Sequence, residues 1–340
     1  MITMIFASTL LVGLVSWFLW EKSNRKTRDM PAGIHEDISL PFTQEYELYH
    51  NNLSLCSKKV RACLAELDID YKSHPIELIE TGSYENIGRD YLAVNPGGLV
   101  PTLVHNGHPV YESHAIIAYL AKQKEGAGDN TLVPADEADR AVMQIWIDKA
   151  SLTGDDPTTN VKRSAANCAG LLTTPVMVSA LQNIPLRLIF EGLLFHRIRS
   201  RAAIFMAMKL RGLSGFTKIK PLMKVLGEAR NNMELHLDAL DAHLQERGPH
   251  IIGNQLTLAD VSWLVILERL VEADWMEFFL RGDQRPNVQR YWQHLQQTPG
   301  YKIGILEFQS AVMDAAIQRL KSHKRNNPAF TASLEGQGQQ

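Results

Sequence analysis

The stretch from Tyr46 to Leu120 constrains the fold of this chain most, because strand patterns and helix patterns alternate in it over short distances. It opens with YELYHN (46–51), which is typical of a strand, and a turn follows at 51–54. In 56–67 the apolar residues recur at i, i+3, i+4 and i+7, namely Val60, Cys63, Leu64 and Leu67. This spacing predicts one buried face of a helix.

The alternation continues with a strand expected over 70–78 and a short helix over 83–92. A hairpin over 102–111 and a helix from Glu112-Ser113 onward follow. Asn106-Gly107 marks the hairpin, because this dipeptide supplies the positive φ angles that a tight turn needs. The predicted order is therefore βαβαββα.

Three motifs in this stretch resemble the thioredoxin-like N-terminal domain of glutathione S-transferases. They are Ser54-Leu55-Cys56-Ser57, the run NPGGLVPTL from Asn95 to Leu103, and Glu112-Ser113-His114-Ala115-Ile116. Their order and spacing together carry the resemblance. It implies an α/β thioredoxin-like, glutathione-binding domain over 45–125, followed by an all-α domain.

Beyond Lys122 the pattern is helical throughout, as that resemblance implies. Helices are predicted over 136–151, over 228–246 and from Thr257 to Leu270. Thr257 and Asp260 have the spacing of a capping box, flanked by an apolar staple. The resemblance spans about Tyr46 to Ser310. The other expected parts are a linker over 126–130, the all-α domain over 131–320 and a flexible, polar tail over 321–340.

An insertion of about 155–226 departs from the family pattern, since it is longer than a connection between two helices needs to be. Its part from Pro185 to Lys224 holds nine basic residues against a single acid, Glu191, with phenylalanines interleaved. Such a segment favours contact with an anionic membrane surface. An extended helical hairpin with solvated charges explains it as well, and both interpretations stay open.

The first twenty residues differ in kind from the rest. Ile2 to Trp20 carries no charged side chain, and a basic stretch containing Lys22 and Arg25 follows. At about 1.5 Å per residue this length can cross a hydrocarbon core of roughly 30 Å. We therefore expect a transmembrane anchor over 1–21, a linker over 22–44, and soluble domains that face the cytoplasm. A cleaved signal peptide competes with this interpretation, but it requires a basic start and a small-residue cleavage site.

Composition limits the remaining classes of function. The formal net charge of −2 gives no bulk electrostatic reason to expect a nucleic-acid partner. Three cysteines, Cys56, Cys63 and Cys168, show no paired spacing, so a disulfide framework is not expected and a reducing compartment is favoured.

Ser54 and Cys56 are the candidate catalytic residues. The start of a helix favours an anion, and by resemblance to serine-type transferases Ser54 lies where its hydroxyl would stabilise the glutathione thiolate. Cys56 lies in the first helical turn, where a thiol is acidified. The motif is similar to that of bacterial tetrachlorohydroquinone dehalogenases, in which a cysteine exchanges with a glutathione adduct. The alternatives are an ordinary N-cap serine and a small buried thiol.

The resemblance also assigns glutathione-binding residues. Val100 would bond the cysteinyl part of glutathione beside a cis Pro101, and Glu112 and Ser113 would take the γ-glutamyl group. Tyr49 is a lower-ranked alternative to Ser54 as the activating residue. His105, His108 and His114 have no completing carboxylate or thiol, so no metal site is predicted.

The function expected from these residues is that of a membrane-anchored glutathione S-transferase-like enzyme. Glutathione would be the co-substrate, and a hydrophobic electrophile would be conjugated or reductively processed. A homodimer stays open. The alternative is a non-enzymatic membrane protein similar to the ganglioside-induced differentiation-associated family, whose members combine a long insertion with a C-terminal membrane segment.

Overall fold

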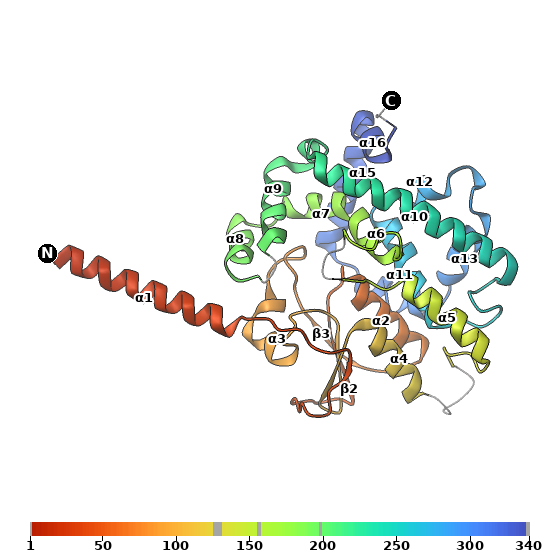
Figure 1. Ribbon diagram of the computed structural model, residues 1–340, viewed down its shortest axis with the longest axis horizontal. Coiled ribbons are helices and arrows are strands. Elements are labelled where there is room, and N and C mark those ends of the chain that lie inside the picture. The colour runs from red at the N-terminus through yellow and green to blue at the C-terminus, as the bar shows by residue number, and fades with distance from the viewer. Residues whose placement is uncertain (1, 125–130, 155–157, 197–198, 338–340) are drawn as a thin grey trace.

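The computed structural model describes residues 2–124, 131–154, 158–196 and 199–337. It has a body with an α/β part and a helical part, from which the long helix α1 (Ile2–Asn24) projects (Figure 1). The linker predicted at 126–130 lies outside the described residues, as do Arg197 of the basic segment and the end of the predicted tail.

The α/β part is built on a five-stranded sheet in the order β1-β5-β4-β2-β3. The strands are β1 (Gly33–Ile34), β2 (Tyr46–His50), β3 (Lys72–Pro75), β4 (Thr102–His105) and β5 (His108–Tyr111). β2 and β3 run parallel, and the other neighbouring pairs run antiparallel. Asn106 and Gly107 close the β4–β5 hairpin with φ angles of 49° and 87°, which confirms the predicted turn.

Helices cover both faces of the sheet. α2 (Leu55–Glu66) and α4 (Ser113–Gln123) pack together on the side of the helical part, and α3 (Arg89–Val94) lies on the other side after the short turn η1 (Glu85–Ile87) (Figure 1). All four residues of the predicted helix face are buried, namely Val60, Cys63, Leu64 and Leu67. The predicted α/β thioredoxin-like fold with a following all-α part is confirmed.

The helical part runs from residue 131 to the end of the described chain. Its longer helices are α5 (Glu137–Lys149), α6 (Ala165–Leu172), α7 (Thr174–Leu181), α8 (Leu186–Phe195), α9 (Arg199–Phe216), α10 (Lys220–Arg247), α11 (Leu258–Glu272), α13 (Pro286–Leu295), α15 (Ala311–Asn326) and α16 (Pro328–Glu335). Shorter turns lie between them, namely α12 (Met276–Leu280), η2 (Arg281–Asp283), α14 (Pro299–Lys302) and η3 (Leu306–Phe308). α10 begins well before the predicted start near Glu228.

α11 is the buried centre of this part, as its apolar sequence predicts. The capping box forms. The backbone N–H of Thr257 donates to Asp260 Oδ2 at 2.7 Å, and the Thr257 side chain accepts from the backbone N–H of Asp260, the third residue of the helix. Asp260 also accepts from Ile251 N and from the Tyr291 hydroxyl, at 3.0 and 2.8 Å. One buried carboxylate therefore ties the start of α11 to the preceding loop and to α13.

The segment predicted as an insertion has two different halves. α6 packs against α10 and α11, and α7 packs against α15, so this half belongs to the core of the helical part. α8 and α9 pack against each other at the periphery, next to the base of α1 (Figure 1). Only the second half extends the domain outward.

Two expectations about the ends of the body are wrong. The segment predicted as a linker contributes β1, which pairs with β5 at the sheet edge through Gly33 and Ile34. The segment predicted as a flexible tail is largely helical, because α15 continues to Asn326 and α16 follows. Phe330 of α16 is buried and lies 6.3 Å, centroid to centroid, from the ring of Phe216.

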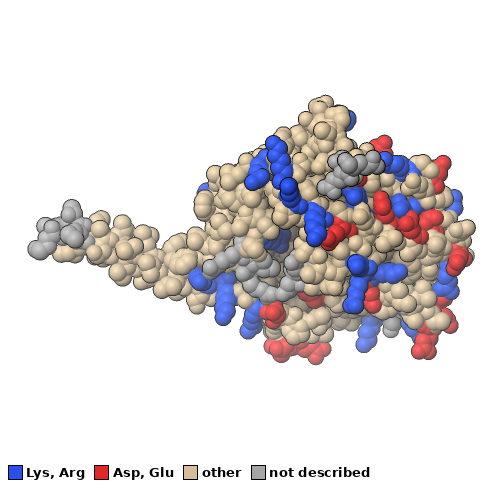
Figure 2. All heavy atoms as spheres, turned by 45° about the horizontal axis from the view of Figure 1, so that its top comes forward, with Lys and Arg blue, Asp and Glu red and all other residues tan. Residues whose placement is uncertain are grey.

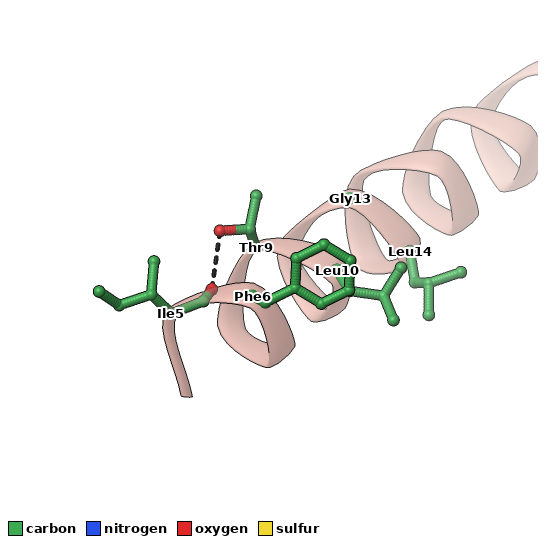
Figure 3. A pocket seen from close by; sticks show the side chains of 6 residues that line it. All are labelled: Ile5, Phe6, Thr9, Leu10, Gly13 and Leu14. Atoms are coloured by element: carbon green, nitrogen blue, oxygen red, sulfur yellow. Dashed lines mark hydrogen bonds between the residues drawn. The ribbon is translucent and has the colours of Figure 1, made fainter. Parts of the chain in front are cut away.

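α1 is long and apolar enough to cross a membrane, and its apolar window is not buried in the body. A surface hollow on this helix is lined by Ile5, Phe6, Thr9, Leu10, Gly13 and Leu14 (Figure 3). Its polar contact is the Thr9 hydroxyl, which donates to the Ile5 carbonyl at 2.8 Å. Because one helix supplies all of its walls, this hollow is a groove between side chains and not a substrate site.

Candidate functional site

Ser54 is the N-cap of α2, and a local hydrogen-bond network fixes it there. Its Oγ accepts from Ser57 N at 3.2 Å, and its own N–H donates to Asn51 Oδ1 at 3.3 Å. Asn51 in turn is held by Ile76 O and Thr81 Oγ1, at 2.8 and 3.0 Å. The capping role weighed for Ser54 is thus realised. Accepting one bond leaves the hydroxyl proton free to donate to another group.

Cys56 lies in the first turn of α2, and the Ser113 hydroxyl at the start of α4 is near enough to act on the pKa of its thiol. Fifty-seven positions separate the two residues in the sequence (113 − 56). The packing of α2 against α4 therefore brings Cys56 near one of the predicted γ-glutamyl ligands. Ser113 is buried, whereas Ser54 and Cys56 are each partly exposed.

Burial acts against the acidification expected for Cys56 from its place on the helix. Burial raises the pKa of its thiol, and the charge of Glu112 adds to this rise. The ammonium of Lys59, the Ser113 hydroxyl and the charge of Arg269 act in the opposite direction, but burial prevails. The thiol is thus held largely neutral.

The two lysines after Cys56 have different partners. Lys59 Nζ donates to the Ala150 carbonyl at 3.0 Å, so its charge stays near the thiol and is itself buried. Lys58 Nζ lies 2.5 Å from Glu272 Oε1 of α11. Lys58 therefore joins the two parts of the body, which was not expected from its place next to Cys56.

Thr102, the first residue of β4, pairs with Tyr49 near the end of β2, so Val100 and Pro101 lie at the edge of the sheet from which the turn to Ser54 leaves. The Val100-Pro101 peptide bond is cis, as predicted. The Leu99 carbonyl accepts from the Tyr91 hydroxyl at 2.5 Å and from Asn95 Nδ2 at 2.9 Å. Both donors also contact Thr102 Oγ1, at 3.0 and 2.9 Å, so side chains of α3 and its C-terminus hold both ends of the cis-proline turn.

Glu112 has an unusual backbone conformation. Its φ of 68° and ψ of 121° are rare for a residue with a side chain. Its side chain is exposed, and its carbonyl accepts the Ile116 N–H at 2.9 Å in the first turn of α4. Such backbone strain is found preferentially at functional sites, which agrees with the ligand-binding role predicted for Glu112.

Tyr49 lies on the other face of the sheet from α2. Its ring stacks on His74 with a centroid distance of 4.3 Å and lies 6.0 Å from the ring of Tyr91. His50, the next residue, points to the α2 side, where its Nδ1 accepts from Arg61. Burial, with the nearby Glu47 charge, raises the pKa of Tyr49. The structure therefore does not place Tyr49 with Ser54 and Cys56.

The three histidines for which no metal role was predicted lie in different surroundings. His105 contacts Tyr119 and Glu45, at 2.6 and 3.3 Å. His108 contacts the Ile38 carbonyl, and His114 is exposed. Among the described residues no group of His, Cys, Asp and Glu side chains has the arrangement of a metal site.

Arg269 of α11 belongs to the site region and was not predicted. Its guanidinium donates to the Leu53 carbonyl just before Ser54, contacts Thr173 Oγ1 at 3.3 Å and lies 3.0 Å from Glu272. It thus holds the turn that carries Ser54 against the helical part. The signal was in the sequence, since charged residues in an otherwise apolar helix need buried partners.

The fold and the site define a class of proteins in which a thioredoxin-like domain presents a helix start and a cis-proline turn, and a helical domain covers it. Residues 53–123 match the glutathione S-transferase N-terminal domain, and residues 223–294 match its C-terminal domain. The chain belongs to the glutathione S-transferase superfamily, whose members use glutathione.

Similar proteins agree with this assignment. The tetrachloro-p-hydroquinone reductive dehalogenase of Sphingobium chlorophenolicum is 24% identical over 259 residues, which cover 74% of this chain and 92% of that protein. The crystal structure of a β-etherase from Sphingobium sp. strain SYK-6 has a TM-score of 0.62 at 19% identity and covers 78% of this chain and all of its own. A theta-class transferase of Xanthomonas axonopodis pv. citri, solved with glutathione bound, has a TM-score of 0.51 at 21% identity, with 79% and 100% covered.

Proposed function

We propose that this protein is a membrane-anchored glutathione S-transferase-like enzyme that conjugates glutathione to a hydrophobic electrophile or reductively processes the adduct. The packing of α2 against α4 is the observation that carries the proposal. It brings the start of α2, where the glutathione sulfur would lie, next to the start of α4, where the γ-glutamyl group would lie. The relative solved with glutathione bound shares this fold.

The start of α2 would stabilise the glutathione thiolate. A helix leaves its first amides without intrahelical acceptors and carries about half a positive charge at that end. Ser54 already satisfies the Ser57 amide, so the amides of Leu55 and Cys56 stay available to an anion. The Ser54 proton would donate to the sulfur and lower its pKa, because a hydrogen bond to the charged form favours that form.

The rest of the tripeptide would lie along the cis-proline turn. Backbone groups of Val100 would pair with the cysteinyl part in the manner of an added strand, with Pro101 setting the direction of the turn. Ser113 and its amide at the start of α4 would bind the γ-glutamyl carboxylate. The exposed Glu112 carboxylate would pair with the ammonium group.

Conjugation and reduction differ in what Cys56 does. In conjugation the glutathione thiolate attacks the electrophile and Cys56 takes no part. In the reductive outcome the Cys56 thiolate attacks the sulfur of the adduct, the reduced product leaves with a proton, and a mixed disulfide forms between Cys56 and glutathione. A second glutathione then releases Cys56 and becomes oxidised glutathione. Burial raises the pKa of Cys56 and so opposes this second route, whereas the nearby Lys59 ammonium lowers that pKa and favours it.

α1 would hold the body at a membrane, with the soluble domains in the cytoplasm. The support is an exposed apolar helix at the N-terminus and the basic stretch that follows it. An electrophile that partitions into lipid would be concentrated next to the site. Protease treatment of intact cells tests the orientation: the body should be protected until the membrane is opened.

Titration of the full-length protein in detergent micelles with glutathione tests the site. Saturable binding is expected, weakened tenfold or more by Ser113→Ala, because a buried ligand-facing hydroxyl is lost. Ser54→Ala should leave binding nearly unchanged but reduce formation of the bound thiolate, which absorbs in the ultraviolet. Ser39→Ala, at an exposed serine, is the matched control. No saturable binding at millimolar glutathione would refute the enzyme and favour the non-enzymatic alternative.

A Cys56→Ser variant separates the two reactions. Conjugation to a model aryl halide should persist in this variant. Formation of oxidised glutathione with a halogenated hydroquinone should disappear, and in the wild type the mixed disulfide at Cys56 should be detectable by mass spectrometry. Equal production of oxidised glutathione by variant and wild type would rule out a redox role for Cys56.

A further inference from the structure

α8 presents an apolar stripe to solvent while its other side is packed into the body. Leu186, Phe190 and Leu194 are 43%, 56% and 47% exposed. They follow each other at intervals of four residues, so they lie on one face of the helix. Ile189 and Gly192 on the other side are buried. A contiguous apolar face on a well-packed helix indicates a contact surface for an apolar partner.

The end of α1 is fixed to the end of α8. The rings of Phe18 and Phe195 lie 5.7 Å apart, centroid to centroid. The Arg25 guanidinium lies 4.7 Å from the centre of the Phe195 ring and 2.7 Å from Glu191 Oε1, and it also donates to the Ile87 carbonyl at 2.9 Å. α8 and α1 are therefore held as one unit.

These contacts fix the position of α8 along the normal of a membrane that α1 spans. Phe18 lies between Trp17 and Trp20, the aromatic residues expected at the boundary between headgroups and acyl chains. Arg25 is seven residues further on, about 10 Å along the helix axis. Because Phe195 touches both Phe18 and Arg25, the end of α8 lies within the interfacial layer whenever α1 spans the bilayer.

Two basic residues of the 185–224 segment are bound within the body. Arg201 is paired with Glu80 at 2.5 Å, and Lys209 Nζ donates to the last carbonyls of α7, at 3.0 Å each. Phe205 and Phe216 are buried in the core. These side chains are therefore held by the body, and the apolar face of α8 is a contact that does not depend on them. In the view of Figure 2, the flank of the body that adjoins α1 carries tan and blue atoms and few red ones, so no acidic cluster on this flank opposes contact with a membrane.

We propose that the outer face of α8 inserts into the headgroup and acyl boundary of the bilayer that α1 spans, through Leu186, Phe190 and Leu194. The exposed Arg187 beside this stripe keeps its charge at the headgroups, as long cationic side chains do. The inference rests on the proposed membrane placement of α1. It adds a second contact, which fixes the tilt of the body on the membrane and requires no anionic lipid.

Nitroxide labels on the full-length protein in uncharged phosphatidylcholine bilayers test this inference. The label is placed through Phe190→Cys, through Leu14→Cys on α1, or through Leu235→Cys, each in a Cys56→Ser background. Leu235 is the matched control because it is 65% exposed and lies on α10. Power saturation compares the access of oxygen, which concentrates in lipid, with that of a water-soluble nickel complex.

The inference would be supported if the ratio of oxygen access to nickel access were several-fold higher at position 190 than at position 235 and close to the ratio measured at position 14. A lipid-like ratio at 14 with a water-like ratio at 190 would overturn it while leaving the anchor in place. A water-like ratio at 14 would refute the anchor and this inference together. Leu194→Cys repeats the measurement one turn along α8, and disagreement between 194 and 190 would also count against an inserted face.

Discussion

The carboxylate of Asp260 should be one of the largest single contributors to the stability of the helical part. It is fully buried. Its two oxygens accept four hydrogen bonds, from Thr257 N and Oγ1 at 2.7 and 2.8 Å, from Ile251 N at 3.0 Å and from the Tyr291 hydroxyl at 2.8 Å. Asp260→Ala leaves these donors buried without an acceptor. At about 1 kcal/mol for each donor, the low end of the range for unsatisfied buried groups, the loss is about 4 kcal/mol.

Denaturant unfolding of the full-length protein in micelles, followed by tryptophan fluorescence, measures this loss as a shift in midpoint at unchanged slope. Tyr291→Phe removes only one of the four donors and should cost about 1 kcal/mol. Asp314→Ala is the matched control, since Asp314 also lies in the first turn of a long helix but is exposed; it should cost under about 1 kcal/mol. An Asp260→Ala midpoint as close to wild type as that of Asp314→Ala would refute the reasoning.

Three further outcomes are expected. Burial raises the pKa of Glu47, but the hydrogen bonds that its carboxylate accepts outweigh burial and bring the pKa from 4.5 down to about 2. Since the folded pKa is depressed, Glu47→Gln should be less stable than wild type at pH 7. The urea midpoints of the two proteins should converge as the pH falls from 4.5 to 2. Glu272→Leu should cost about 3 kcal/mol because it leaves the buried Lys58 charge without its partner, and Lys58→Met should cost less because Glu272 still pairs with Arg269. The double variant should cost less than the sum of the two single changes; thermal unfolding of all four proteins measures this coupling, and simple additivity would contradict it. Gly192→Ala should lower the melting temperature at a cost of about 1 to 3 kcal/mol, because a Cβ there would overlap the Tyr84 hydroxyl; an unchanged melting temperature would show that Tyr84 moves aside freely.

Short-range features of this chain could be predicted from the sequence. The hairpin at Asn106-Gly107 and the capping box at Thr257 depend on residues within a few positions of each other, so their spacing is enough. The apolar face of α2 follows from its helical period for the same reason. The motifs around Ser54 and Glu112 could be found because their order along the chain matches a family.

Features that depend on long-range packing were missed. The contact between Cys56 and Ser113 depends on how α2 and α4 pack, and the raised pKa of Cys56 depends on burial that a helix position alone does not reveal. The role of Arg269 could not be predicted because its partner, the Leu53 carbonyl, is distant in the sequence. A two-residue strand such as β1 has no period to detect. The helix of 311–326, in contrast, carries a detectable stripe of buried residues, Met313, Ala316, Ile317 and Leu320, which its polar composition obscured.

β1 makes the sheet dependent on residues that precede the thioredoxin-like core. Gly33 and Ile34 pair with Tyr111 and Val110 and so cover the outer side of β5. A fragment that begins near Tyr46 would uncover a row of free N–H and C=O groups, and uncovered edges of this kind template pairing between chains. Shortening the protein for solubility by cutting at the predicted domain boundary would therefore promote aggregation, whereas a start near Arg25 would keep the edge protected.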